Sequence, residues 1–250
     1  DPCNTNKPGN RNVSCSQLKR QGHSKSGVYE IYILGKPLNV WCDMTSEDGG
    51  GWTVVQRQSE KETNKSFFER DLEAYKREFG TAEESFWIGL EHLHALTSYP
   101  NGQQALRIVL DRSDERKEKT AVYYNKFHVA SKEQNYKLTI EEYDHKKSTS
   151  YDAMSDQNGS GFSVKTYKKG KEEYSCFKDT LTGGWWFKVN ECNYANLNGQ
   201  KLHFITPTTF PRGITWYNRM NTKSYNYRYH KGEMQIRDAD FGFCTGSLKS

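Results

Sequence analysis

The chain has 250 residues, 34% of them hydrophobic and 14% aromatic, and its 36 basic and 31 acidic residues give a net charge of +5. A chain of this length can bury a substantial core as one large domain or two small ones, and so few aliphatic residues mean that Tyr, Phe and Trp must supply much of it. Charges of both signs are interleaved along most of the chain, which disfavours nucleic-acid binding, and no apolar run is long enough to span a membrane.

Cysteine usage and glycosylation sequons indicate a secreted, extracellular protein. The six cysteines include no CxxC pair, which favours disulfides in an oxidising compartment over zinc or dithiol redox chemistry. Sequons occur at Asn12, Asn64 and Asn158, and we expect only some of them to be glycosylated. The first residues lack the basic-then-apolar pattern of a signal peptide, so we expect the sequence to start after a cleaved leader.

The first part of the chain predicts a β-hairpin. Residues 27–33 (GVYEIYI) and 38–44 (LNVWCDM) alternate as strands do, with the turn LGKP between them. We expect Cys15 and Cys42 to tie this hairpin. The glycine run before Trp52 lacks the GK[ST] of a phosphate-binding loop and instead predicts a turn that enters a strand, WTVVQR.

Two amphipathic segments follow, at residues 64–79 and 84–96, where apolar side chains recur at near-helical spacing. We expect both to be helical and to pack on a sheet. Alternation predicts strands at residues 105–110, 121–129 and 136–143, and the charged residues 111–119 indicate an exposed hairpin loop, with a docking surface as the alternative.

Catalytic and metal-binding patterns are missing from the sequence. His92 and His94 are two positions apart on an expected helix, so they point to different sides, and we expect surface histidines rather than a metal site. GxSxG, HExxH, GxGxxG and Walker motifs do not occur. We therefore predict that the protein is not an enzyme and needs no cofactor.

The densest feature of the sequence is residues 176–199, CFKDTLTGGWWFKVNECNYANLNG. Cys176 and Cys192 would close a small loop, and a disulfide between them would constrain the unfolded chain by roughly 3 kcal/mol. A stapled loop of this kind commonly holds a site. We expect Trp185 and Trp186 to be core aromatics beneath it rather than ligand contacts.

Several motifs together resemble the fibrinogen C-terminal domain family. They are Cys15, GVYEIYI, CDMTSEDGGGWTVVQR, ESFWIGLEHLHALT, NGQQALRIVL, GGWWF, ANLNG and the closing EMQIRDADF, and the resemblance extends from residue 15 to residue 243. It implies an α+β fibrinogen C-terminal globular domain: a central antiparallel sheet with short helices and a loop-rich C-terminal subdomain that carries the ligand site. On this basis we expect an N-terminal extension at 1–14 and one domain at 15–250, with subdomains at 15–55, 56–150 and 151–250.

The family's calcium loop is altered in this chain. The resemblance places Thr166 and Lys168 where two aspartates would bind the ion, and further lysines follow. Calcium requires hard, anionic oxygen ligands, whereas a lysine at about 4 Å would repel the ion by several kcal/mol. We predict that calcium is absent or weakly bound. The lysines could instead attract sulfated or phosphorylated polymers, with a merely solvated loop as the alternative.

The resemblance also implies a pocket that accepts an acetyl group in the lectin-type members. An apolar wall would hold the methyl group and a fixed donor the carbonyl. The corresponding residues here are Leu181, Asn193, Phe210, Tyr225 and Tyr227, with a cis bond expected at Ser175–Cys176. Asn193 replaces a histidine, and we expect Tyr225 and Tyr227 on one side of a strand. Insertions before Cys192 and before Tyr225 border the pocket, and for Phe210 and Tyr225 a core position stays open.

Two functions are compatible with this resemblance. The first is a lectin, similar to ficolins and tachylectins, that binds acetylated or related glycans on microbial surfaces in innate defence. The second is a protein-binding domain similar to angiopoietin-like members, with a receptor as partner. We expect Cys3 to pair with Cys244, with an interchain bond as the alternative. An upstream segment that oligomerises the full-length protein would add avidity.

Overall fold

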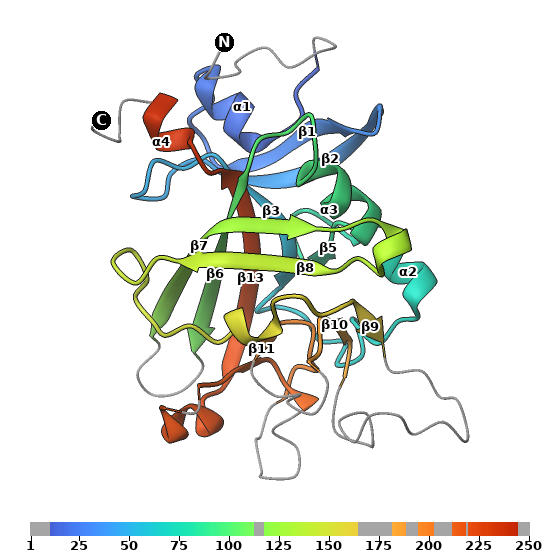
Figure 1. Ribbon diagram of the computed structural model, residues 1–250, viewed down its shortest axis with the longest axis vertical. Helices are drawn as coiled ribbons and strands as arrows, with labels where there is room; N and C mark the ends of the chain where they lie inside the picture. The colour runs from blue at the N-terminus through green and yellow to red at the C-terminus, as the bar shows by residue number, and fades with distance from the viewer. Residues whose placement is uncertain are drawn as a thin grey trace.

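The computed structural model describes residues 11–112, 118–164, 182–188, 195–202, 212–218 and 220–244, without the side chains of residues 225, 226, 243 and 244. Its centre is a nine-stranded antiparallel sheet in the order β1-β2-β3-β13-β6-β7-β8, to which β4 and β5 add beside β3 (Figure 1). The strands are β1 (Gly27–Ile33), β2 (Lys36–Asp43), β3 (Trp52–Gln58), β4 (Phe79–Gly80), β5 (Phe86–Trp87), β6 (Gln104–Arg112), β7 (Lys119–Val129), β8 (Leu138–Tyr143) and β13 (Tyr229–Asp238).

Short helices and two small sheets surround this central sheet. The helices are α1 (Cys15–Arg20), α2 (Leu72–Lys76), α3 (Leu90–Leu96) and α4 (Phe241–Cys244), and the 3₁₀ turns are η1 (Lys132–Gln134), η2 (Ser155–Gln157) and η5 (Thr222–Asn226). The small sheets pair β9 (Ser163–Val164) with β10 (Gly184–Trp185), and β11 (Ala195–Asn196) with β12 (Thr215–Trp216). Among the described residues, no helix is long and apolar enough to cross a membrane. The expected α+β fold with a central antiparallel sheet is confirmed.

Strand β13 lies between β3 and β6, so the end of the chain completes the middle of the sheet. Its side chains alternate between two faces. Met234 and Ile236 are buried in the hydrophobic core, whereas Glu233, Gln235 and Arg237 line a groove of about 1260 Å³ on the other face. The chain leaves the sheet after β8 and returns at β13, and the described elements between them, from β9 to η5, lie at the end of the molecule at the bottom of Figure 1.

The predicted hairpin is confirmed in β1 and β2, and Cys15 and Cys42 form a disulfide with their Cα atoms 5.5 Å apart. The glycine-rich turn is confirmed too: Gly49, Gly50 and Gly51 all have positive φ. At Gly50 a Cβ atom would lie 2.4 Å from the carbonyl oxygen of Met44, so only glycine fits there.

The two helical segments expected at residues 64–79 and 84–96 were wrong in extent, because the helices cover only Leu72–Lys76 and Leu90–Leu96. Asn64 folds the chain into a turn by accepting a hydrogen bond from the amide of Ser66, and α2 starts only where Asp71 accepts one from Ala74. The second segment first forms β5 and begins its helix after Gly89, whose φ is 97°. Local side-chain hydrogen bonds and a glycine therefore divide both patterns.

His92 and His94 are partly buried, which corrects their expected place on the surface. Their Nδ1 atoms lie 2.8 Å from the carbonyl oxygens of Ile88 and Val129 respectively. His94 thereby connects α3 to the end of β7. Among the described residues, no group of three or more His, Cys, Asp or Glu side chains could hold a metal ion.

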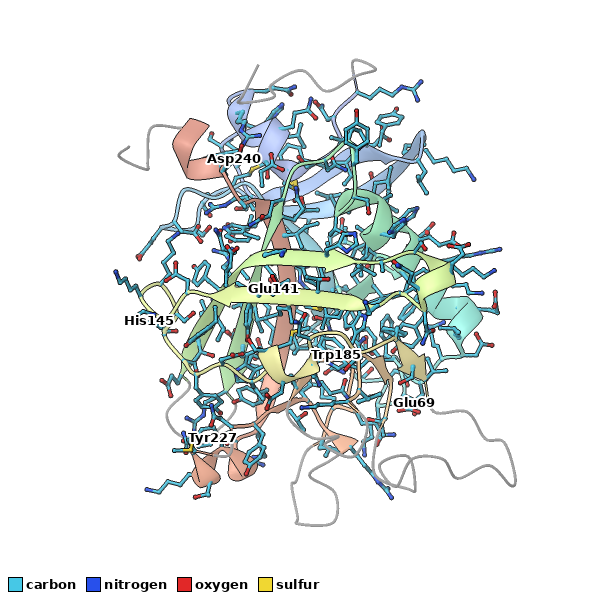
Figure 2. The ribbon with its side chains drawn as sticks, viewed as in Figure 1. Glu69, Glu141, His145, Trp185, Tyr227 and Asp240 are labelled. Carbon is cyan, nitrogen blue, oxygen red and sulfur yellow. A yellow bond between two sulfur atoms is a disulfide. The ribbon has the colours of Figure 1, made fainter. Side chains whose placement is uncertain are left out.

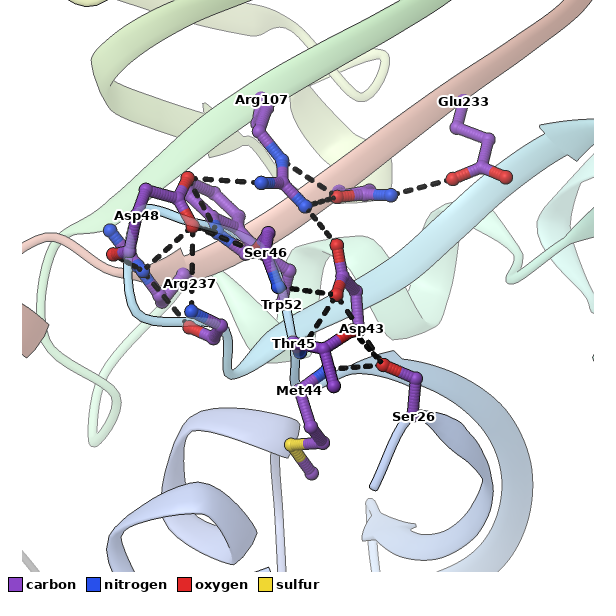
Figure 3. A network of polar contacts seen from close by, with 12 residues as sticks. Ser26, Asp43, Met44, Thr45, Ser46, Asp48, Trp52, Arg107, Glu233 and Arg237 are labelled. Carbon is purple, nitrogen blue, oxygen red and sulfur yellow. Dashed lines mark hydrogen bonds and ion pairs between the residues drawn. The ribbon is translucent and has the colours of Figure 1, made fainter. Parts of the chain in front are cut away.

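A network of charged side chains covers the groove face of the sheet (Figure 3). Arg107 on β6 donates to Asp43 at 2.5 Å, to Asp48 at 2.9 Å and to Gln235 on β13 at 2.8 Å. Arg57 on β3 donates to Glu233 on β13 at 2.8 Å. These bonds cross from β3 to β13 to β6, so they fix the register of the last strand against both neighbours.

Asp48 is the common partner at one end of this network. It accepts hydrogen bonds from Ser46, Trp52 and Tyr123 besides the one from Arg107. Burial alone would raise the pKa of Asp48, but the charges of Arg107 and Arg237 and the hydrogen bonds together lower it to about 2 from the usual 3.8. The folded state therefore favours the ionised carboxylate.

This depressed pKa predicts an acid-dependent loss of stability. The contribution of Asp48 is fully present above its unfolded pKa of 3.8 and is lost as the pH falls towards 2. Allowing for solvent screening, we expect it to amount to about 1 kcal/mol. In urea unfolding, Asp48→Asn should be less stable than the unmodified protein at pH 7, and the gap should narrow by that amount between pH 4 and pH 2. Glu47→Gln, an exposed carboxylate in the same loop, is the control, and a gap that stays constant over this range would contradict the assignment.

Candidate ligand-binding end of the molecule

The predicted site segments start and end on paired residues at one end of the molecule. Val164 pairs with Gly184, Ala195 with Trp216, and Gln200 forms a bridge with Gly213. The residues between these anchors include most of the predicted pocket. The anchor residues themselves lie at the end of the molecule where β13 begins (Figure 1).

The two tryptophans of the GGWW segment form the floor beneath this end. Trp185 and Trp186 are fully buried, which confirms their expected place in the core. Their Nε1 atoms donate to the side chain of Gln157 at 2.9 Å and to the carbonyl oxygen of Tyr136 at 2.8 Å. Figure 2 shows Trp185 in the interior, between the sheet and the lower end of the molecule. The rings thus bury apolar area while their polar atoms stay satisfied.

The Gly-Gly pair is required by close packing above this floor. Gly183 has a φ of 72°, and a Cβ atom there would lie 2.1 Å from the carbonyl oxygen of Asn198. The amide of Gly183 donates to Glu69, and that of Gly184 donates to the hydroxyl of Tyr75, both at 2.8 Å. Burial raises the pKa of Tyr75, so its hydroxyl keeps the proton that it donates to the carbonyl oxygen of Phe68 at 2.7 Å.

The ANLNG turn connects this pair to the central sheet. Asn198 donates to the carbonyl oxygen of Gly184 at 2.8 Å, and Asn196 donates to that of Thr182 at 3.0 Å. From β3, Gln56 donates to the turn at Asn198, and Gln58 donates to it at Gly199. All four amide side chains are buried. Neutral amides therefore bind the turn's carbonyl groups and hold it to the sheet without burying a charge.

Tyr227 is the predicted pocket residue whose side chain the structure describes. It is partly buried, and the guanidinium carbon of Arg112 lies 3.6 Å from its ring centroid. Arg112 is held in turn by Glu118 at 3.1 Å. Figure 2 shows Tyr227 at the lower end of the molecule, beside the start of β13. A cation–π contact of this kind fixes the ring orientation.

The prediction that Tyr225 and Tyr227 lie on one side of a strand was wrong. Tyr225 lies in the 3₁₀ turn η5, and β13 begins only at Tyr229. Ser224 explains the difference: its hydroxyl donates to the carbonyl oxygen of Asn221 at 2.5 Å and accepts from the amide of Asn218 at 3.2 Å. These local bonds close a compact turn instead of an extended strand.

Most of the remaining predicted site residues lie outside the described residues. These are Leu181, Asn193, Phe210, Ser175, Cys176, Cys192, Cys3, Thr166 and Lys168. The acetyl pocket, the altered calcium loop, the cis bond and the two further disulfides therefore stay predictions, as do the extension at 1–14 and the subdomain boundaries. Cys244 is the last residue of α4. Asn64 and Asn158 are exposed and Asn12 is partly buried, and their glycosylation stays a prediction.

Sequence reasoning missed two residues that support this end, Arg112 and Tyr151. The charges around Arg112 predicted an exposed loop. Arg112 is instead the last residue of β6, and its guanidinium group covers the ring of Tyr227. Tyr151 and Trp216 exchange hydrogen bonds, at 2.8 Å from the Tyr151 hydroxyl to the Trp216 carbonyl oxygen and at 3.0 Å from the Trp216 Nε1 to the Tyr151 carbonyl oxygen. These partners are 65 positions apart in the sequence, so no local pattern reveals them.

The groove on the far face of the sheet is a separate feature. Its floor consists of the Arg57, Glu233, Gln235, Arg107 and Asp48 network, whose members bind one another. Tyr227 is not among the residues that line it. We interpret this floor as the part of the sheet that fixes β13.

The packing around the Gly-Gly pair predicts that one added methyl group strongly destabilises the folded protein. Gly183→Ala should destabilise the protein by about 2–4 kcal/mol, because the Cβ atom would meet the Asn198 carbonyl and the positive φ disfavours alanine. Gly102→Ala is the matched control, since its Cβ atom would have no neighbour within 4 Å. Urea unfolding measures both variants, and equal stability of the two would contradict the described packing.

Comparison with known proteins supports the family resemblance along most of the chain. The family model of the C-terminal globular domain of fibrinogen beta and gamma chains matches residues 11–239. Ryncolin-4 of Cerberus rynchops is 34% identical over 225 residues, which are 90% of this chain and 60% of ryncolin-4. Angiopoietin-4 of Mus musculus is 33% identical over 231 residues, which are 89% of this chain and 41% of that protein. The chain thus spans less than two thirds of these relatives.

Solved structures agree with this assignment. The fibrinogen-like globe domain of human ANGPTL6 superimposes with a TM-score of 0.75 at 30% identity, covering 93% of this chain and 97% of that one. A lamprey fibrin D-dimer in complex with the peptide Gly-His-Arg-Pro-amide gives a TM-score of 0.67 at 26% identity, covering 90% of this chain and 73% of that one. Proteins with this domain are recognition or structural proteins rather than enzymes. The chain belongs to the fibrinogen C-terminal globular domain family and, like the other members, is not an enzyme.

Proposed function

We propose that this domain is secreted and acts as a lectin that binds acetylated or related glycans at its loop-rich end, in innate defence. The observation that carries the proposal is the scaffold beneath that end. Buried hydrogen bonds fix Gly184 to Tyr75 and the ANLNG turn to β3 and to Gly184. A preorganised support of this kind reduces the entropic cost of holding a ligand.

The chemistry of the predicted pocket suits an acetyl group. Phe210, Tyr225 and Tyr227 would supply an apolar wall for the methyl group, and the side chain of Asn193 could donate to the carbonyl oxygen. The expected cis bond at Ser175–Cys176 would expose a backbone amide as a second donor. Leu181 would complete the wall where related lectins carry a tyrosine.

Binding should not depend on the family's calcium ion. Thr166 and Lys168 replace two aspartates in the corresponding loop, which removes two anionic ligands and adds a cation. We therefore propose a calcium-independent site. Its affinity would come from contacts with the glycan alone, and from avidity where several domains are joined in a longer protein.

A protein-binding role is the second candidate. Two insertions border the predicted pocket, and the structure superimposes well on the globe domain of ANGPTL6. Under this alternative the same end of the molecule would contact a protein receptor, and no sugar would bind. The two candidates differ in whether a free monosaccharide competes for the site.

Retention on acetylated beads tests the proposal. We expect the domain to bind in the presence of a chelator and to elute with free N-acetylglucosamine. Tyr227→Ala should weaken retention about fivefold, because a lost aromatic contact costs about 1 kcal/mol. Tyr99→Ala is the control, since Tyr99 is 95% exposed after α3. Lack of retention under every condition would contradict the lectin, and retention that needs calcium would contradict the altered loop.

A further inference from the structure

The net charge of the chain is concentrated in one segment. Residues 192–232 contain six basic residues and no aspartate or glutamate. The whole chain has 36 basic and 31 acidic residues, so the remainder has 30 basic and 31 acidic residues and a net charge of −1. One sixth of the sequence therefore accounts for the entire net positive charge of the chain.

The described parts of this segment lie together at the loop-rich end. They comprise β11, the ANLNG turn, β12, η5 and the first residues of β13 (Figure 1). The acidic residues of β13 come later along the strand, and Asp240 lies at the opposite end of the molecule, as Figure 2 shows. Five of the six basic residues belong to the described parts of the segment, so their positive charge lies at the loop-rich end: Lys201, Arg212, Lys223, Arg228 and Lys231.

The turns within this segment are built without carboxylates. Asn196 and Asn218 each accept a hydrogen bond from the amide two residues ahead, at 3.0 Å and 2.7 Å. Outside the segment, the same bond is made by four aspartates and one asparagine: Asp43, Asp48, Asp144, Asp152 and Asn64. Because aspartate performs this role equally well, the asparagines keep the turn geometry and avoid negative charge.

Other elements bring a few acidic groups to this end, and described residues account for their contacts. Glu118 is 3.1 Å from Arg112, and Glu60 is 3.8 Å from His230. Glu69 accepts from the amide of Gly183. Lys231 forms an ion pair with Glu233 at 3.0 Å, whereas Lys223 on η5 is exposed.

We propose that this positive end binds a sulfated polysaccharide. The inference rests on the proposed function, which makes the ligand a glycan. It further specifies that this glycan is negatively charged. A sulfated chain carries a regular series of anions along a flexible backbone, and it would release counterions on binding to a surface of one sign. Affinity would then fall steeply as salt rises.

The tyrosines of this segment argue against a nucleic acid as the ligand. Base binding on such a surface uses exposed aromatic faces for stacking. Tyr217 and Tyr229 are only 7% and 8% exposed, and one face of Tyr227 is covered by Arg112. Two of these three rings are therefore buried and the third has one face covered, which leaves little described aromatic surface for base stacking.

The test compares one sulfated probe with matched controls at about 150 mM salt. Heparin oligosaccharides, the same oligosaccharides desulfated and N-acetylated, and duplex DNA of equal charge are titrated against the whole domain. Lys223→Glu should weaken heparin binding about fivefold or more, because one ionic contact becomes repulsive. Lys223→Gln should weaken it less. Lys36→Glu makes the same change in net charge at an exposed site on the β1–β2 hairpin and should have less than a twofold effect.

The outcomes separate this inference from the proposed lectin function. Heparin binding that is sensitive to Lys223 supports the inference, even if acetylated beads fail to retain the protein. Retention on acetylated beads without heparin binding would overturn the inference and leave the lectin proposal intact. Equal effects of Lys36→Glu and Lys223→Glu, or equal affinity for DNA and heparin, would also overturn it, because net charge alone would then explain binding.

Discussion

The pairing of β13 with both β3 and β6 is the constraint on which the rest of the structure depends. It joins the last strand of the chain to the middle of a sheet whose other members come from the first 143 residues. Everything between β8 and β13 must therefore leave the sheet at one edge and return to its centre. The strands in the described part of this region have only two residues each, and side chains from the sheet and from α2 hold that part in place. The position of the loop-rich end is thus a consequence of the topology.

Two kinds of polar interaction maintain this arrangement, one on each side of β13. On the groove face, arginine and carboxylate pairs such as Arg57 with Glu233 cross between strands. On the other side, Gln56 and Gln58 bind the ANLNG turn through neutral amides. Removing one partner of a buried charged pair leaves the other uncompensated, which costs more than the pair contributes. The charged pairs on the groove face therefore specify the register of β13. The glutamine side chains on the other face specify where the ANLNG turn packs on the sheet.

The sequence predicted those parts of the fold that depend on local patterns, including the β1–β2 hairpin, the glycine turn and the buried tryptophans. The family resemblance supplied the sheet around them. Helix α1 was missed, although Ser14 and Gln17 form a recognisable capping pair at its start. Hydrophobic spacing overestimated the helices because Asn64, Asp71 and Gly89 redirect the chain. Contacts such as Tyr151 with Trp216, or Arg112 with Tyr227, join distant segments and have no local signal. The candidate site was predictable only as far as the resemblance placed its residues.

The proposed glycan site combines a rigid floor, a predicted acetyl pocket and basic residues at the loop-rich end of the molecule. A crystal structure of the domain soaked with N-acetylglucosamine tests this site most directly. We expect electron density for the sugar at the loop-rich end, with its acetyl group in contact with Asn193 and with Tyr225 or Tyr227. Density for the sugar only in the groove over β13, or none at a saturating concentration, would contradict it.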